Sequence, residues 1–107
     1  MAPVTRFAAF KYKPGTTEEQ KRKALDGLIA LYEENAHLVN QGPTGGRNNN
    51  PEGLGKGFDI VFTVEFKSEA NRDEFIPDPK HVAYKMSIMD IVEDVIVYDF
   101  VKGDYGY

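Results

Sequence analysis

The chain has 107 residues, of which 41% are hydrophobic and 28% charged, and its formal net charge is −4. This length suits one domain over residues 1–107, and the composition is that of a globular protein. The negative charge gives no overall attraction for phosphates, so we expect no nucleic-acid partner. The absence of cysteine excludes thiolate chemistry, and no apolar segment approaches the roughly 18 residues of a membrane span. We therefore expect a cytoplasmic protein that does not bind membranes.

A strand and a helix are predicted first. Residues 4–12 (VTRFAAFKY) are rich in β-branched and aromatic side chains and end at a Pro-Gly turn signal, which predicts a strand. Thr17 and Gln20 then have the spacing of a capping box, and the two glutamates between them favour the positive end of a helix dipole. Apolar residues recur from there at steps of three and four, so we expect a helix that continues to about residue 39.

A glycine-rich segment and the clearest strand follow. Residues 40–57 contain six glycines, two prolines and three consecutive asparagines, which predicts a long loop with room for one short strand. A loop of this length either covers a functional site or is a mobile connection. Residues 58–66 (FDIVFTVEF) alternate strictly between apolar and mixed side chains, so we expect a strand with one face buried under helices.

Two short helices and a final strand complete the chain. Ser68 is placed to cap a helix that ends near Pro77, and Asp78 is placed to cap a second helix that opens at Pro79. In this second helix the apolar spacing predicts that Val82, Met86 and Met89 face the core. Residues 94–101 (DVIVYDFV) predict the last strand, and residues 102–107 (KGDYGY) an arm.

This order of elements predicts an α+β fold in which helices cover one face of a small sheet. The uncovered face would still carry apolar side chains, which would be costly in water at about 25 cal/mol per Å² of apolar area. We therefore expect a homodimer in which two sheets meet face to face. The residues behind this expectation are Val61 and Thr63, together with apolar residues on both faces of the last strand (Val95, Ile96, Val97, Tyr98 and Phe100).

Several segments together resemble one known family. They are FKYKPGTTEEQ, GGRNNNPEGLGKGFD, VEFKSEANRDEF, DPKHVAY and VIVYDF, and they extend over nearly the whole chain. The sequence is similar in these segments to the stress-responsive dimeric α/β barrel proteins. The resemblance implies a ferredoxin-like α+β fold with a four-stranded antiparallel sheet, a homodimer that closes as a barrel and, in some relatives, further assembly.

The resemblance also suggests a type of chemistry. One plant relative, olivetolic acid cyclase, closes a linear polyketide by aldol condensation and uses a histidine and a tyrosine. The histidine corresponds to His81, but the tyrosine corresponds to Phe75, which has no hydroxyl. Three other polar pocket positions of that enzyme correspond to Arg6, Leu28 and Ile60. Only the histidine is shared, and a common fold does not by itself carry a function.

His81 is predicted at the third position of the helix that Asp78 caps. The helix end disfavours a charged imidazole, nearby Asp73 and Asp78 favour it, and burial decides between them. Three roles remain open for this residue. It could bond a loop carbonyl, act as a base or ligand contact, or bind a metal together with Asp73, Glu74 or Asp78.

Two functional hypotheses follow. The first is a pocket for a small apolar or aromatic ligand, with aldol or cyclase chemistry, no cofactor and no metal. In that pocket His81 would be the base, Arg6 and Tyr84 would be donors, and the apolar walls would be Leu28, Ile60, Phe62 and Phe75. The second hypothesis is a non-catalytic, stress-protective structural protein. An open pocket of a few hundred Å³ beside His81 would favour the first, and a filled core would favour the second.

Overall fold

A computed structural model describes all 107 residues, and its elements follow the order β, α, β, β, α, α, β. A short 3-10 helix, η1, precedes the second strand. The elements are β1 (Val4–Tyr12), α1 (Glu18–Glu34), η1 (Ala36–Leu38), β2 (Val39–Arg47), β3 (Ile60–Phe66), α2 (Glu69–Phe75), α3 (Pro79–Ser87) and β4 (Val92–Phe100).

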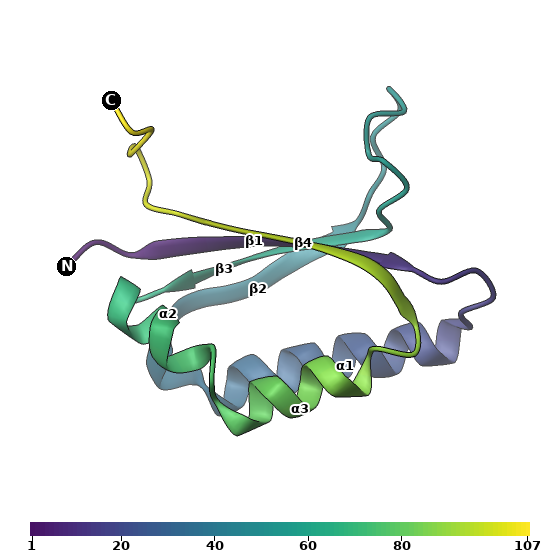
Figure 1. The fold of residues 1–107 in the computed structure, drawn as a ribbon, viewed down its shortest axis with the longest axis horizontal. Coiled ribbons are helices and arrows are strands. Elements are labelled where there is room, and N and C mark those ends of the chain that lie inside the picture. Colours follow the sequence, from purple (N-terminus) through teal and green to yellow (C-terminus); the bar gives the residue numbers. More distant parts are fainter.

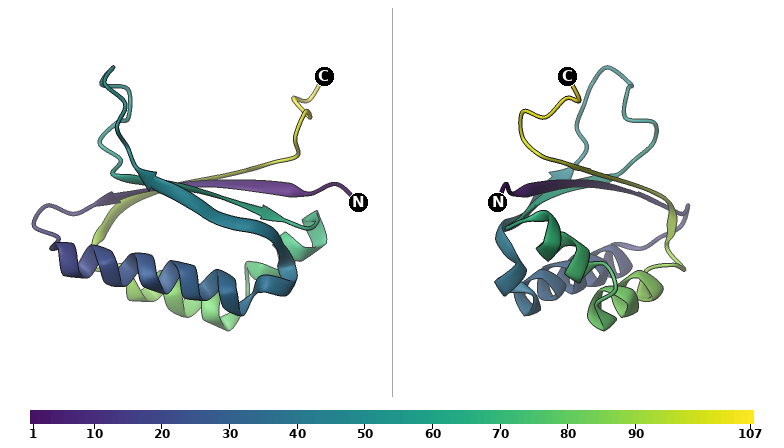
Figure 2. Two further views of the ribbon diagram at one scale, coloured as in Figure 1. Left: turned by 180° about the vertical axis from the view of Figure 1, so that it is seen from behind. Right: turned by 60° about the vertical axis from the view of Figure 1, so that its left-hand side comes forward.

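The four strands form one antiparallel sheet in the order β2-β3-β1-β4. All three α-helices lie on the same face of this sheet (Figure 1), and the two further views agree (Figure 2). The β2–β3 loop and the C-terminal tail extend on the opposite side (Figure 1). This arrangement confirms the predicted α+β fold with helices on one face.

The core lies between the sheet and the helices. In the central strands, Ala8 of β1 pairs with Phe62 of β3, and both side chains point toward the helices. Because side chains alternate along a strand, every second residue counted from these two faces the same way. The predicted strand alternation is confirmed, because Phe62, Val64 and Phe66 are buried. Helix α1 starts as predicted, since the Thr17 hydroxyl accepts the Gln20 amide and the Gln20 side chain accepts the Thr17 amide.

The outer face of the sheet is uncovered in the single chain. Phe7 on β1 pairs with Tyr98 on β4, and both lie on this face. Tyr98 and Phe100 are 66% and 47% exposed. No helix of the chain packs on this face (Figure 2). The exposed Tyr98 and Phe100 make it partly apolar, as the sequence predicted.

The segment over residues 40–57 contains the strand for which the sequence left room, but this strand is longer than expected. Residues Val39–Arg47 form β2, a nine-residue edge strand that pairs with β3. Gly45 makes this pairing possible, because a Cβ there would overlap the Val61 carbonyl oxygen and Phe62. Pro43 is tolerated since an edge strand leaves some of its N–H groups unpaired. Glycine content alone therefore misrepresents this segment, and the irregular loop covers only residues 48–59.

Other boundaries and one helix face also differ from the prediction. Helix α1 ends at Glu34 rather than near residue 39. The buried Asn35 follows the helix, and its side-chain amide donates to the Leu31 carbonyl. The prediction that Val82, Met86 and Met89 face the core is wrong, because they are 39%, 67% and 64% exposed. Helix α3 instead packs through His81, Tyr84 and Ile88. None of the helices combines the length and apolar character that a membrane-crossing segment needs.

Candidate functional site

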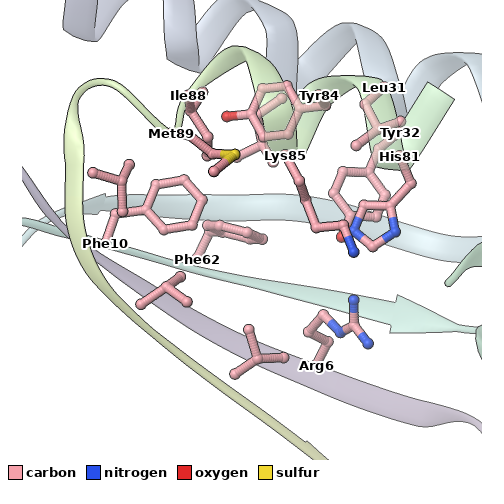
Figure 3. A pocket seen from close by; sticks show the side chains of 14 residues that line it. Arg6, Phe10, Leu31, Tyr32, Phe62, His81, Tyr84, Lys85, Ile88 and Met89 are labelled. Carbon is pink, nitrogen blue, oxygen red and sulfur yellow. The ribbon is translucent and has the colours of Figure 1, made fainter.

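A pocket of about 350 Å³ lies between α3, α1 and the β1–β4 side of the sheet. Most of its walls are apolar, and four polar side chains gather at one end (Figure 3). The polar residues are Arg6, Tyr32, His81 and Lys85. The other lining residues are Phe10, Leu28, Leu31, Phe62, Tyr84, Ile88, Met89, Val92, Val95 and Val97. The pocket thus has the polarity that suits a mostly apolar ligand with one polar group.

His81 sits at the third position of α3, as the sequence indicated. The Asp78 carboxylate caps the helix by accepting the Lys80 and His81 backbone amides at 3.1 and 3.2 Å. The imidazole Nδ1–H donates to the Ile76 carbonyl oxygen at 3.0 Å. In the neutral ring this bond leaves the Nε2 lone pair free to accept a proton. One nitrogen therefore makes the loop contact, while the other remains available in the pocket.

The environment of His81 favours the neutral ring. Burial lowers the pKa of His81 below its ordinary value, and the positive charges of Lys85 and Arg6 lower it further. The hydrogen bond to the Ile76 carbonyl opposes this shift without cancelling it. The sequence left open whether the pKa of His81 is raised or lowered, and burial decides that it is lowered. The ring is therefore neutral and can accept a proton at neutral pH.

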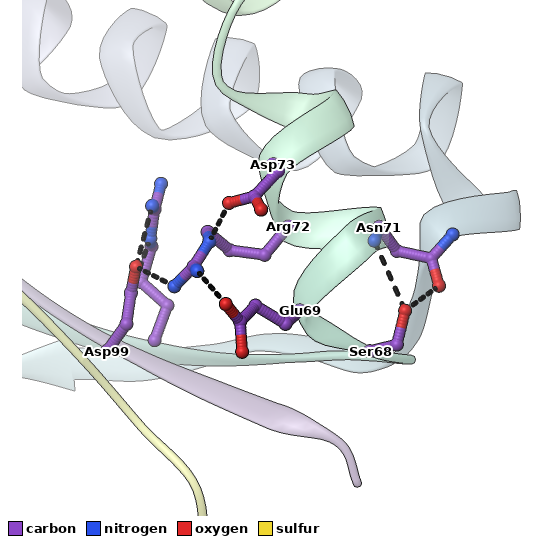
Figure 4. A network of polar contacts seen from close by, with 7 residues as sticks. Ser68, Glu69, Asn71, Arg72, Asp73 and Asp99 are labelled. Atoms are coloured by element: carbon purple, nitrogen blue, oxygen red, sulfur yellow. Dashed lines mark hydrogen bonds and ion pairs between the residues drawn. The ribbon is translucent and has the colours of Figure 1, made fainter. Parts of the chain in front are cut away.

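Arg6 of β1 belongs to a network that also includes Asp99 of β4 and Arg72 of α2. Figure 4 shows the part of this network around Arg72 and Asp99. The Arg6 guanidinium donates to both oxygens of Asp99 on β4, at 2.9 and 3.1 Å, and Arg72 of α2 donates to the same carboxylate at 3.1 Å. Burial alone would lower the pKa of Arg6, but Asp99 more than offsets it and the net pKa is raised. Burial likewise would raise the pKa of Asp99, and the two arginines hold it below its usual value. The charge of Arg6 is therefore already paired within the protein.

Tyr84 contributes its ring rather than its hydroxyl. The hydroxyl donates to the Ala24 carbonyl of α1 at 2.8 Å, and burial raises the pKa of Tyr84. Its ring lies against Gly27, where an added Cβ would come within 3.1 Å of Cε1. Tyr84 thus fixes α3 against α1 and lines the pocket with an aromatic face.

The other predicted wall residues divide into two groups. Leu28 and Phe62 line the pocket with His81, as does Arg6. Phe75 does not line it, because its ring is fully buried behind His81, with ring centroids 4.3 Å apart, and is stacked on Tyr32 at 4.9 Å. Ile60 lies toward the β2 side and lines separate surface hollows. Phe75 therefore supports the imidazole, and Ile60 lies outside this pocket.

Sequence reasoning missed two polar residues of the pocket. Tyr32 falls among the apolar positions of the predicted first helix, and although only 3% of the residue is exposed, its hydroxyl lies at the polar end of the pocket (Figure 3). Burial raises the pKa of Tyr32 to about 12 despite the opposing charge of Arg6. Lys85 lies one helical turn after His81, and this i, i+4 spacing was the signal that could have revealed it.

Acidic side chains do not converge around His81. No group of three or more His, Asp or Glu side chains in the chain is arranged to hold a metal ion. Asp73 instead accepts the Arg72 guanidinium at 2.7 Å, and Asp78 caps α3. Asp73 and Asp78 thus have structural partners, and the Glu74 carboxylate lies 3.7 Å from the His37 imidazole.

Comparison with known proteins places the chain in a family. The family model described as "Stress responsive A/B Barrel Domain" matches residues 4–102. The chain belongs to the stress-responsive A/B barrel domain family. The family resemblance inferred from the sequence is therefore confirmed. A search of curated protein sequences finds no significant match.

Solved structures share the ferredoxin-like fold of this A/B barrel protein. The At3g17210 protein of Arabidopsis thaliana is 22% identical, with 91% of this chain and 92% of that chain covered and a TM-score of 0.82. The hydroxynitrile lyase of Passiflora edulis is 17% identical, with 96% and 95% covered and a TM-score of 0.85. A dimeric ferredoxin-like protein of unknown function from Thermobifida fusca is 19% identical, with 94% and 91% covered and a TM-score of 0.74. At these identities the likeness shows the fold alone.

Proposed function

We propose that this A/B barrel protein is a homodimer in which each subunit binds a small, mainly apolar or aromatic ligand in the pocket beside His81. The observation that carries the proposal is an apolar pocket of about 350 Å³ that ends at a half-buried imidazole with a free Nε2. Its volume lies at the lower end of the roughly 300–1,000 Å³ of small-molecule sites. A filled core would have left no such space.

The dimer part of the proposal is supported by the outer sheet face. Exposed Tyr98 and Phe100 lie there with no covering helix, and apolar area of this kind favours association by about 25 cal/mol per Å² buried. The structural neighbour from Thermobifida fusca is itself described as dimeric. The ligand pocket lies on the opposite, helix-covered side, so one subunit can use both surfaces at once (Figures 1 and 3).

The chemistry that suits the pocket is proton transfer of the aldol or polyketide-cyclase type. Nε2 of His81 would take a proton from a carbon next to a carbonyl, and the electron pair left behind would form an enolate. The enolate carbon would then bond to a second carbonyl carbon of the same ligand as the π bond of that carbonyl breaks, and the resulting alkoxide oxygen would take back the proton from the His81 imidazolium. Donors at the polar end, Arg6 and Tyr32, would stabilise the oxygen that gains charge. One structural neighbour is a hydroxynitrile lyase, which makes a lyase-type reaction a reasonable class to test.

A non-catalytic, stress-protective structural protein is the alternative. Two observations favour it: Phe75 and Asp99 tie two polar-end residues, His81 and Arg6, into structural contacts. In that case the pocket would be an incidental space, and stability and association would be the properties of value. The two proposals differ in whether any ligand depends on the imidazole.

A ligand screen separates the two. We would measure thermal shifts of the wild type, His81→Ala and the surface control His37→Ala against aromatic acids, lactones and β-diketones. The ligand-binding proposal expects ligands that stabilise the wild type and His37→Ala but stabilise His81→Ala less. NMR of a bound β-diketone in D2O would then report His81-dependent exchange of its acidic C–H. If no ligand distinguishes His81→Ala from the other proteins, the pocket hypothesis is rejected and the structural role is favoured.

A further inference from the structure

The polar end of the pocket holds one cation that has no carboxylate partner. Of the two pocket cations, Arg6 is paired with Asp99 at 2.9 Å, whereas Lys85 makes no ion pair in the structure. The other lysine on the same helix, Lys80, is paired with Glu34 at 3.1 Å on the surface. Lys85 is thus the pocket charge that remains available to a ligand.

The position of Lys85 directs this charge to the reactive end of the pocket. Residues four apart on a helix lie on the same face, so Lys85 and His81 of α3 are neighbours. Figure 3 shows the Lys85 side chain reaching along the pocket toward the His81 ring, above Arg6. The positive charge of Lys85 is close enough to lower the pKa of His81. An anionic group bound there would therefore contact an ammonium and lie next to the neutral imidazole.

The rest of the pocket limits what that anion can be attached to. Phe10, Phe62 and the Tyr84 ring give aromatic walls, and the pocket volume of about 350 Å³ leaves room for only a small ring system. A free phosphate or other small inorganic anion would leave these walls in contact with water. A flat apolar acid satisfies both the walls and the cation.

We propose that Lys85 determines the substrate class of the pocket by selecting small aromatic or alicyclic anions, such as carboxylates and phenolates, over neutral analogues. This inference rests on the ligand-binding function proposed above and specifies its ligand. Lys85 would supply the unpaired positive charge, whereas Arg6, whose charge is paired with Asp99, would contribute only hydrogen bonds from the N–H groups that Asp99 leaves free. The Lys85 ammonium would also stabilise the enolate that would form beside Nε2. The bound acid and the enolate would each place a negatively charged oxygen at this position.

Matched ligand pairs test this assignment. The probes are benzoate, trans-cinnamate and 2-naphthoate, each compared with its uncharged primary amide, which has nearly the same shape. Dissociation constants would be measured by titration calorimetry or NMR at low salt for the wild type, Lys85→Met, Lys85→Arg and Lys80→Met. Lys85→Met keeps an unbranched side chain of similar length without the charge, and Lys80→Met removes a lysine of the same helix that points away from the pocket.

We expect the wild type to bind at least one acid about tenfold more tightly than its amide, the size of effect typical of a charge-assisted hydrogen bond at a partly exposed site. Lys85→Met should remove this preference, while Lys85→Arg and Lys80→Met should retain it. Raising the salt concentration should weaken binding of the acid but not of the amide.

Results that contradict these expectations distinguish a failure of the Lys85 assignment from a failure of the ligand-binding function. If the wild type binds acid and amide equally, or if Lys85→Met keeps the preference, the role of Lys85 is refuted while a ligand pocket remains. If the wild type binds neither member of any pair, the ligand-binding function and the selection by Lys85 are both rejected.

Discussion

The Asp99 carboxylate should be required for stability because it neutralises a nearly buried guanidinium. The Arg6 side chain is only 9% exposed and Asp99 19% exposed, and the two are joined by hydrogen bonds of 2.9 and 3.1 Å. Asp99→Asn keeps the shape of the side chain but leaves Arg6 without a counter-charge. Arg72 is affected less, because Asp73 and Glu69 still lie within 2.7 and 3.9 Å of it.

The expected cost of Asp99→Asn is about 2–4 kcal/mol in the free energy of unfolding. Two unit charges 4 Å apart attract by about 4 kcal/mol at an effective dielectric constant near 20. Removing one partner of a fully buried pair costs about 3–5 kcal/mol. The lower range applies here because Asp99 retains some contact with water and an asparagine carbonyl can still accept one N–H.

The measurement is urea denaturation at pH 7 and one fixed protein concentration, since the stability of a dimer depends on concentration. Arg6→Met/Asp99→Val provides the matched control, because replacing both charges by apolar groups leaves no uncompensated ion. We expect this double variant to be destabilised by less than Asp99→Asn alone. The reasoning is refuted if the double variant loses as much unfolding free energy as Asp99→Asn or more.

Three further outcomes are expected. The pKa of His81 is lower in the folded state than in the unfolded state, so the unfolded chain binds more protons as the pH falls below about 6.5. The wild type should therefore lose more unfolding free energy from about pH 7 to 5 than His81→Gln does. An equal loss in both proteins, measured by denaturant titration, would contradict this. Gly45→Ala should lower the free energy of unfolding by about 2 kcal/mol or more, because the added Cβ overlaps β3. A Cβ at Gly46 meets no atom within 4 Å, so Gly46→Ala should change the free energy of unfolding by no more than about 0.5 kcal/mol in the same assay. Phe100→Glu should shift the protein toward monomer in analytical ultracentrifugation at micromolar concentration. Met86→Glu should not, because Met86 is exposed on the helical layer and not on the outer sheet face. A wild type that sediments as a monomer would reject the dimer.

Local chemistry in the sequence determined the elements and their caps. Thr17, Ser68 and Asp78 each cap the helix that they were expected to cap, because capping depends only on residues two or three positions away. Strict alternation likewise determined which face of β3 is buried. The position of His81 at the start of α3 follows from the same local rule.

Tertiary structure decided the rest. Residues 39–47 become a strand only because β3 offers a partner, and pairing between distant segments leaves no local pattern in a glycine-rich sequence. The contact between Tyr84 and Gly27 of α1 determines which face of α3 packs, so Val82 and Met86 remain exposed. The different roles of Arg6 and Lys85 also follow only from the tertiary structure. Asp99, which lies 93 residues along the chain from Arg6, forms an ion pair with Arg6, whereas Lys85 has no such partner.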